Sequence, residues 1–290
     1  MTSTATWTEH DLNVVSTSSQ ASIHYARLGT RTGPPLMLLH GFSDAGLCWL
    51  RLASDLASDY DLILPDAAGH GRTSAAADAE RLSRAVADPV AVLDALGIDR
   101  VTLIGHSMGA ATAAAVAGTL PERVRGVVLE DPPWRDGPWQ PTPQAHAARG
   151  SRAMLGSPEW VAWIRSVKTM SPEQRREVAE RERGDWPAED RPHWIEAKAQ
   201  FNIDAFTSPS VPDMTRWREA VRAIQCPTLL ITGDVERGAI VTPEVAEEAR
   251  GINPKVRVVH VPGAGHNIRR EQYAPLLSAV REFLGPVARA

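Results

Sequence analysis

Short apolar runs that end in glycine-rich turns recur along the chain. Most of them are continuous rather than alternating, which is typical of strands buried on both faces of a parallel sheet. Two N-terminal segments with mixed polarity, TWTEHDLNVV and SIHYARLG, predict a pair of β-strands before these runs. The apolar runs themselves are PLMLLHG, YDLILPDAAGHG, RVTLIGHSMG, VRGVVLEDPP, CPTLLITGD and VRVVHVPGAGH.

Helical patterns lie between these runs. Apolar residues recur at spacings of three and four in Leu47–Ser58 and Ala79–Leu96, and the Ala-rich AATAAAVAGTL follows GHSMG. Further helices are predicted at Pro243–Arg250 and Glu271–Leu284. Alternation of strand and helix predicts an α/β fold with a mostly parallel, doubly wound sheet.

One segment breaks this alternation. Residues 134–222 are polar and helical in pattern, and they contain seven of the chain's nine tryptophans. We therefore expect two core segments, 1–133 and 223–290, separated by a helical insert that follows the sixth strand.

Composition narrows the function classes. The 290 residues are 43% hydrophobic and 23% charged, and the net charge is −4, which predicts an ordinary globular protein without affinity for nucleic acid or anionic membranes. The N-terminus has no signal-peptide pattern and no apolar run is long enough for a membrane span, so a cytoplasmic location is expected.

No metal-ligand spacing and no nucleotide-binding glycine motif occurs, so no metal and no cofactor is predicted. Cys48 and Cys226 are expected to be buried thiols.

The sharpest motif is GHSMG, Gly105 to Gly109, between an apolar strand and a helix of small residues. A G-x-S-x-G sequence in this setting places the serine on a tight strand-to-helix turn, with its hydroxyl exposed above the sheet. The start of the following helix presents backbone N–H groups to a developing oxyanion. These features favour Ser107 as a nucleophile.

Together with LLHGF at 38–42, PDAAGHGRTS at 65–74 and PGAGH at 262–266, this motif makes the chain resemble the α/β-hydrolase family. The resemblance covers nearly the whole chain apart from the insert, which would be the family's helical cap. It implies that Ser107 is the nucleophile and His266 its general base. It also implies that the backbone N–H groups of Phe42 and Met108 form the oxyanion hole, and it makes the 65–74 turn structural.

The acid of the triad is open among three residues. The family pattern after the insert, G-x-x-D, points to Glu236, but the altered spacing of GDVERGAIVT favours its neighbour Asp234. The alternative is Asp131 in VVLEDPPW, at the end of the strand used by the haloalkane dehalogenases and zearalenone lactonases. We rank Asp131 first, Asp234 slightly behind it and Glu236 last.

The predicted function is a cofactor-independent serine hydrolase that cleaves a carboxylic ester or lactone through an acyl-enzyme. Trp134, Trp160 and Trp163 are candidates to line a pocket for a bulky apolar or aromatic substrate, although most of the tryptophans are expected to fill the core of the cap. The sequence is compatible with a homodimer.

Three alternatives accompany this prediction. A carbon-carbon bond hydrolase of the ring-cleavage type would need a cationic pocket, for which Arg135, Arg149 and Arg165 are candidates. A slow-turnover ligand sensor would keep the triad and bind a partner through the cap. An epoxide hydrolase or dehalogenase is disfavoured, because such family members carry Asp at the position of Ser107.

Overall fold

An eight-stranded sheet forms the centre of the computed structural model, which describes residues 6–15, 20–76, 80–136, 157–206 and 216–288. The strand order is β1-β2-β4-β3-β5-β6-β7-β8. Strands β1 and β2 form the predicted N-terminal hairpin, β2 pairs antiparallel with β4, and all the other pairings are parallel. The strands are β1 (Thr8–Val15), β2 (Gln20–Gly29), β3 (Pro35–Leu39), β4 (Asp61–Pro65), β5 (Val101–His106), β6 (Val124–Glu130), β7 (Thr228–Thr232) and β8 (Val256–His260).

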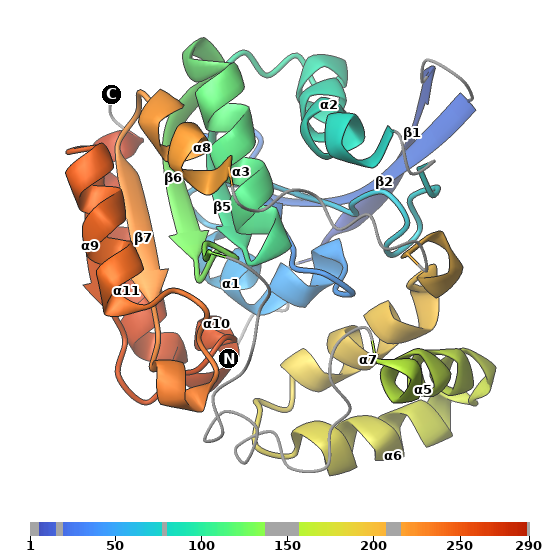
Figure 1. Ribbon diagram of the computed structural model, residues 1–290. Coiled ribbons are helices and arrows are strands. Elements are labelled where there is room, and N and C mark those ends of the chain that lie inside the picture. The colour runs from blue at the N-terminus through green and yellow to red at the C-terminus, as the bar shows by residue number, and fades with distance from the viewer. Residues whose placement is uncertain (1–5, 16–19, 77–79, 137–156, 207–215, 289–290) are drawn as a thin grey trace.

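Helices cover both faces of this sheet, so the predicted doubly wound α/β fold is confirmed (Figure 1). One face carries α2 (Arg81–Ala95), α3 (Met108–Thr119), α8 (Trp217–Ala223) and α9 (Pro243–Ile252). The other carries η1 (Gly46–Trp49), α1 (Leu50–Leu56), α10 (Ile268–Glu271) and α11 (Tyr273–Val287).

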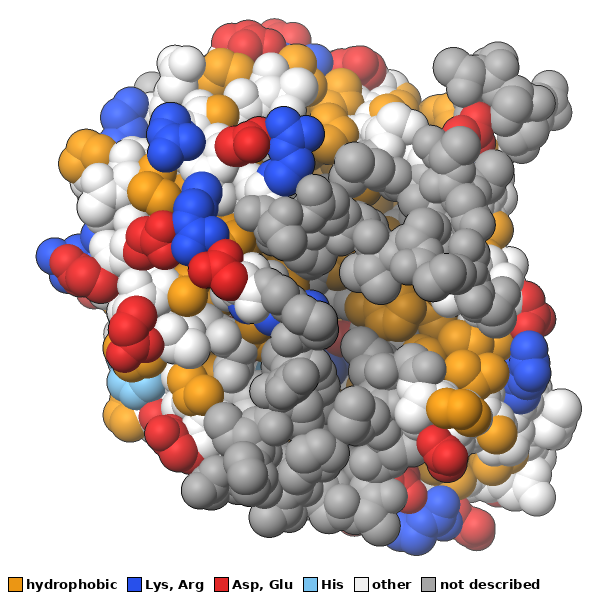
Figure 2. Space-filling view, in the orientation of Figure 1, with side chains coloured by type: hydrophobic (Ala, Val, Ile, Leu, Met, Phe, Trp, Pro, Cys, Tyr) orange, Lys and Arg blue, Asp and Glu red, His pale blue; other side chains and the backbone are white. Residues whose placement is uncertain are grey.

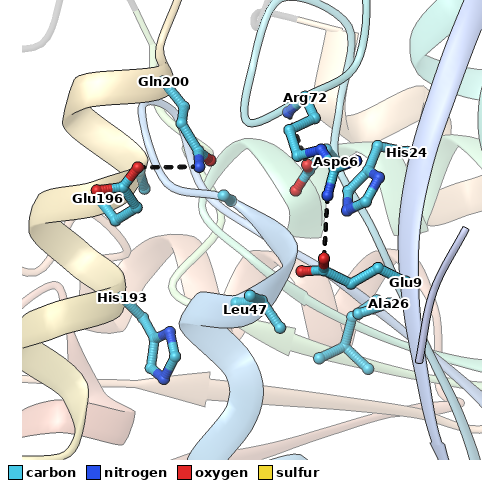
Figure 3. A pocket seen from close by; sticks show the side chains of 12 residues that line it. Glu9, His24, Ala26, Leu47, Asp66, Arg72, His193, Glu196 and Gln200 are labelled. Carbon is cyan, nitrogen blue, oxygen red and sulfur yellow. Dashed lines mark hydrogen bonds and ion pairs between the residues drawn. The ribbon is translucent and has the colours of Figure 1, made fainter. Parts of the chain in front are cut away.

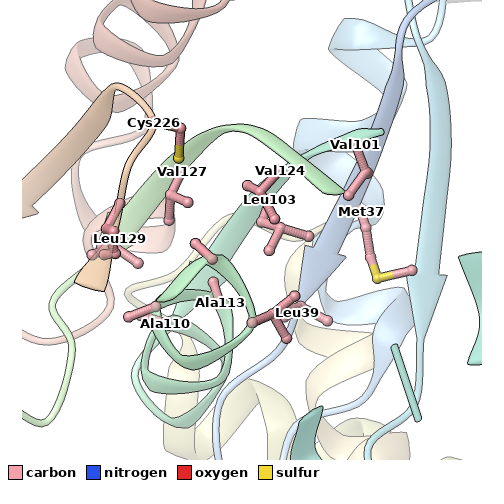
Figure 4. Packing of buried hydrophobic residues seen from close by; sticks show 14 of the residues in the cluster. Met37, Leu39, Val101, Leu103, Ala110, Ala113, Val124, Val127, Leu129 and Cys226 are labelled. Carbon is pink, nitrogen blue, oxygen red and sulfur yellow. The ribbon is translucent and has the colours of Figure 1, made fainter. Parts of the chain in front are cut away.

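Side chains of successive strand residues enter opposite layers, as the pleat of a strand requires. On β3, Met37 and Leu39 join the core beneath α3, whereas Leu36 and Leu38 join the core beneath α1 and α11. Figure 4 shows the first of these layers, where Ala110 and Ala113 of α3 lie against strand side chains. The small residues of α3 let the helix approach the sheet closely.

The insert contains α5 (Pro158–Thr169), α6 (Pro172–Arg183), α7 (Asp190–Gln200) and the short helix η4 (Ile203–Phe206). We call residues 157–206 the cap. These helices form a separate group below the sheet in Figure 1. They have their own buried clusters, one of which includes Val167, Trp186 and Trp194. Ser171 caps the start of α6 with a capping box. Its side chain accepts from Gln174 N, and the Gln174 side chain accepts from Ser171 N.

Both ends of the 134–222 segment pack into the main core. Trp134, which is 2% exposed, stacks on Trp217 of α8 with ring centroids 5.2 Å apart, and both belong to the cluster beneath α3. The chain therefore leaves the core and returns to it at one place.

In the described part of the chain, no helix combines the length and apolar character needed to cross a bilayer. On the face drawn in Figure 2, acidic and basic side chains are interspersed rather than gathered into a patch of one sign.

Candidate active site

Ser107 occupies the turn between β5 and α3. Its backbone has φ 51° and ψ −116°, a strained conformation for a residue other than glycine. The flanking glycines are required by close backbone approaches. A Cβ on Gly105 would lie 2.3 Å from Gly109 O, and a Cβ on Gly109 would lie 2.0 Å from Leu39 O. The strand, serine and helix therefore form the tight, strained nucleophile turn that the sequence predicts, with Ser107 partly exposed.

The turn after β3 lies against this serine. A Cβ built on Gly41 would lie 2.6 Å from His106 Nδ1 and 3.4 Å from Ser107 Cβ, so the residue before Phe42 packs against the nucleophile turn. Asp44 N donates to Gly41 O at 3.0 Å and closes a four-residue turn, which leaves the Phe42 N–H unused by the turn itself. Met108 is the first residue of α3, where the N–H has no partner within the helix. Both predicted oxyanion donors thus belong to segments at Ser107.

His266 reaches the same edge of the sheet and is held by Asp131. Its Nδ1 lies 2.6 Å from Asp131 Oδ2, and the aspartate is fully buried at 0% exposed. Donation from Nδ1 leaves Nε2 as the acceptor for a serine hydroxyl. The contacts among the described residues do not include a bond from Ser107 Oγ to His266 Nε2, and such bonds often tighten only when substrate binds.

Asp131 rather than Asp234 therefore makes the hydrogen bond that a triad acid must make. Asp131 follows β6 with φ 40° and also accepts from Ile240 N and Val241 N, at 2.9 Å each. These two donors belong to the loop after β7, where the spacing departs from the family pattern. The unusual loop is thus the one that satisfies the buried carboxylate.

Asp234 has different partners. Its Oδ1 lies 3.0 Å from His260 Nε2, and its Oδ2 accepts from Gly263 N at 2.8 Å. It therefore braces the loop that carries His266 without contacting that histidine. Glu236 lies exposed in the short helix η6 (Val235–Arg237).

Residues 36–283 match the alpha/beta hydrolase family. The chain belongs to this family. N-formylmaleamate deformylase of Pseudomonas putida is 30% identical over 268 residues, which cover 90% of this chain and 92% of that protein. A lipase of Mycobacterium tuberculosis is 26% identical over 91% of this chain and 98% of its own. These relatives support a hydrolase.

Solved structures agree with the fold. N-formylmaleamic acid deformylase from Pseudomonas putida S16 superposes with a TM-score of 0.70 at 21% identity, covering 94% of this chain and 100% of that one. Est816, described as an N-acyl homoserine lactone degrading enzyme, has a TM-score of 0.66 at 22% identity, with the same coverage. At these identities the likeness concerns the fold alone.

Other histidines of the hydrolase hold loops together. His40 Nδ1 lies 2.8 Å from Gly41 O, and its Nε2 accepts from Ala67 N at 2.9 Å. His106 Nε2 lies 2.9 Å from His266 O. In the 65–74 turn, Asp66 accepts from Gly46 N and Arg72 N, which agrees with a structural role.

The tryptophans predicted to bind substrate occupy three different environments. Trp160 is buried beside Phe42, with ring centroids 6.1 Å apart. Trp163 packs on Trp194 within the cap. Trp134 lies in the main core. Arg149, a candidate for the cationic pocket, lies outside the described residues.

A buried charge cluster beside the site has no counterpart in the sequence predictions. Asp44 accepts from Lys198 Nζ at 3.0 Å and from Arg269 and Arg270 at 2.9 Å each. Arg269 also binds Glu130, donating its backbone N–H at 2.9 Å and its guanidinium at 3.2 Å. All five residues are at most 5% exposed. In the sequence, Asp44 lies in SDAG (43–46), and Arg269 and Arg270 lie in IRRE (268–271). Neither segment matches a known motif.

Burial alone would raise the pKa of Asp44, but Arg270, Lys198 and Arg269 together hold it well below its usual range. Burial raises the pKa of Glu130, and Arg269 opposes that effect. Burial likewise lowers the pKa of Lys198, against the opposing carboxylate of Asp44. Asp44 is therefore a carboxylate that keeps its charge because three cations surround it.

A narrow pocket of about 50 Å³ separates α7 from the N-terminal strands. Figure 3 shows His193, Glu196 and Gln200 of α7 on one side, with Glu9 and His24 of the strands across from them. Neither Ser107 nor His266 lines this pocket. It marks the seam between cap and core rather than the reaction site. Among the described residues, no group of three His, Cys, Asp or Glu is arranged to hold a metal ion.

Proposed function

We propose that the protein is a serine hydrolase that cleaves a carboxylic ester or lactone through an acyl-enzyme. His266 takes the proton of Ser107 as Oγ attacks the carbonyl carbon, and the N–H groups of Phe42 and Met108 stabilise the oxyanion. The proton passes from His266 to the leaving alcohol. Water, deprotonated by the same histidine, then releases the acid and regenerates Ser107.

The observation that carries this proposal is the contact of 2.6 Å between Asp131 and His266 at the edge where the strained Ser107 turn lies. Asp131 fixes the imidazole tautomer and stabilises the imidazolium that forms during attack. The cap places an aromatic cluster beside the proposed oxyanion donor, because Trp160, Phe201 and Phe206 surround the Phe42 ring, and this cluster favours an apolar or aromatic substrate.

The test is hydrolysis of a panel of p-nitrophenyl esters and lactones by the wild type, Ser107→Ala and the matched control Ser58→Ala, which alters an exposed serine. We expect Ser107→Ala to lose at least 1,000-fold in kcat and Ser58→Ala to behave as wild type. A fluorophosphonate should label the wild type and the control but not Ser107→Ala. Equal turnover by wild type and Ser107→Ala would reject the proposal.

A second candidate is a hydrolase for substrates that carry a carboxylate, as the names of the deformylase relatives suggest. Arg135 favours it. Its guanidinium is partly buried four residues after Asp131, and burial lowers its pKa. It has no carboxylate partner among the described residues. Arg165, by contrast, is exposed and pairs with Asp204 at 2.7 Å.

Charge preference separates the two candidates. The wild type, Arg135→Met and the control Arg165→Met would be assayed on p-nitrophenyl butyrate and on the mono-p-nitrophenyl ester of succinate. The second candidate predicts a preference for the succinate ester that only Arg135→Met removes. Equal rates on both esters would leave the neutral ester or lactone as the proposal.

A further inference from the structure

The turn Gly41–Asp44 holds a strained residue next to a proposed oxyanion donor. Ser43 has φ 60°, the left-handed region that turns usually assign to Gly or Asn. Its neighbour Phe42 carries the N–H that would face the oxyanion. Ser43 belongs to the same four-residue turn as the Phe42 N–H, so its left-handed backbone must be held for the turn to keep its shape.

One cap side chain contacts this residue directly. Lys198 Nζ donates to Ser43 O at 2.7 Å, to Ser43 Oγ at 3.0 Å and to Asp44 Oδ1 at 3.0 Å. Its three N–H donors thus meet three acceptors within two consecutive residues of the turn. Lys198 is 5% exposed, so water does not replace these bonds.

The same end of α7 touches the other side of the turn. Phe201, three residues after Lys198, packs edge-to-face on the Phe42 ring with centroids 5.1 Å apart. Ala197 packs on Ala45 and Cys48, directly after the turn. The cap therefore contacts the backbone of Ser43, the carboxylate of Asp44 and the aromatic ring of Phe42.

Replacement of Lys198 would not leave the Asp44 carboxylate without a cationic partner. Arg269 and Arg270 approach Asp44 through its other oxygen, Oδ2. The carboxylate stays compensated when the lysine is gone, whereas the Ser43 carbonyl loses its donor. The three cations are therefore not equivalent, because only Lys198 bonds to the turn backbone among the contacts described.

We propose that Lys198 is a positioning residue that fixes the Gly41–Asp44 turn, and with it the Phe42 N–H, only while α7 is seated on the core. This rests on the proposed function. Docking of the cap then completes the oxyanion hole, so cap position and catalytic competence are linked through one ammonium group. Lys198 itself touches neither the nucleophile nor the proposed reacting atoms.

The experiment compares Lys198→Met with Lys168→Met, the same substitution at an exposed cap lysine. Both would be assayed for kcat and KM on a p-nitrophenyl ester and for inhibition by an aryl trifluoromethyl ketone. The ketone forms a tetrahedral alkoxide on a nucleophilic serine and so reports on the oxyanion hole. Lys198→Arg, which keeps the charge, is the second variant, and thermal unfolding is followed for each protein.

We expect Lys198→Met to lower kcat at least tenfold with KM within a factor of three, and to weaken ketone inhibition by a similar factor. Lys168→Met should match the wild type, and Lys198→Arg should fall between the two. If Lys198→Met does not fold, the same comparison is made with Lys198→Arg alone. A rise in KM without loss of kcat, or unchanged ketone inhibition in a folded variant, would overturn the proposal.

These results are separable from those for the proposed function. If Ser107→Ala keeps full activity, the serine-hydrolase proposal itself fails. If activity depends on Ser107 but not on Lys198, only the positioning role is lost.

Discussion

Asp131 Oδ2 lies 2.6 Å from His266 Nδ1, and the two residues are 135 positions apart in the chain. The carboxylate comes from the end of β6, one strand closer to Ser107 than the end of β7, where Asp234 stands. Substitution of Asp131 and substitution of Asp234 should therefore affect catalysis differently, although the sequence analysis ranks the two acids almost equally.

Asp131→Asn should lower kcat by about 10²- to 10⁴-fold, because an amide cannot hold His266 in the tautomer that accepts the serine proton. Asp234→Asn is the matched control and should lower kcat less than about tenfold, since among the described residues its carboxylate contacts His260 and Gly263 and not His266. Steady-state kinetics at equal folded concentration measure both. A larger loss in Asp234→Asn would assign the acid to β7 instead.

Gly109→Ala should destabilise the protein by about 3 kcal/mol or more, because its Cβ would lie 2.0 Å from Leu39 O and the backbone must shift. Gly251→Ala places the same methyl group in open space within α9 and should stabilise by about 0.5 kcal/mol. Urea unfolding of both variants compares them. Similar stabilities would contradict the close approach of α3 to β3.

The stability of the fold should fall as pH drops below about 6.5. Burial lowers the pKa of His40, His70, His106 and His193 in the folded protein. Between the folded and unfolded pKa values the unfolded chain binds more protons, so the free energy of unfolding rises with pH and is lost on acidification. Each such histidine contributes about 1.4 kcal/mol per pH unit in that window.

His70→Phe isolates one of these contributions. The His70 ring lies among Phe42, Phe201 and Phe206, so a phenyl ring fits the same surroundings. Its unfolding free energy, measured by urea titration from pH 5 to 7, should depend less steeply on pH by about one proton. His10→Phe, the same substitution at an exposed position, is the matched control.

Some acids act in the opposite direction. Burial raises the pKa of Asp88, Glu130 and Asp190, so these groups favour the folded state at low pH and this contribution is lost as pH rises. They are common to wild type and His70→Phe, so the difference between the two slopes cancels them. Identical slopes would show that His70 titrates normally in the folded protein.

Substitution of Trp134 should affect the stability of the fold, whereas substitution of Trp160 should affect substrate selectivity. Trp134→Phe shortens the stack on Trp217 and should cost about 1–2 kcal/mol without changing the relative rates for esters of different acyl bulk. Trp160→Phe alters a ring beside Phe42 and should change those relative rates. Competition between acetyl, butyryl and benzoyl esters, together with urea unfolding, tests both. Altered selectivity in Trp134→Phe alone would reverse the assignment.

The sequence predicts the sheet and the nucleophile turn because local chemistry fixes them. Continuous apolar runs favour buried parallel strands, and only glycine fits at positions 105 and 109. The partner of His266 could not be decided in this way, because the choice between Asp131 and Asp234 depends on how the loop at 238–241 folds back. Ile240 and Val241 donate backbone N–H groups, which leave no trace in residue type.

The charge cluster escaped prediction for a related reason. Asp44, Lys198 and Arg269 come from three distant segments, and each looks like an ordinary surface residue in its own neighbourhood. Trp134 was misleading in the opposite sense, since its position in a tryptophan-rich insert suggested a pocket although it packs in the main core. Such pairings depend on tertiary structure alone.

The stacked Trp134 and Trp217 bring the two ends of the intervening segment together on the core. Closure entropy rises only slowly with the length of such a segment, so we expect the sheet to tolerate caps of other lengths and sequences between these two rings. A graft that retains a lysine facing Ser43 would carry over the connection to the oxyanion turn as well.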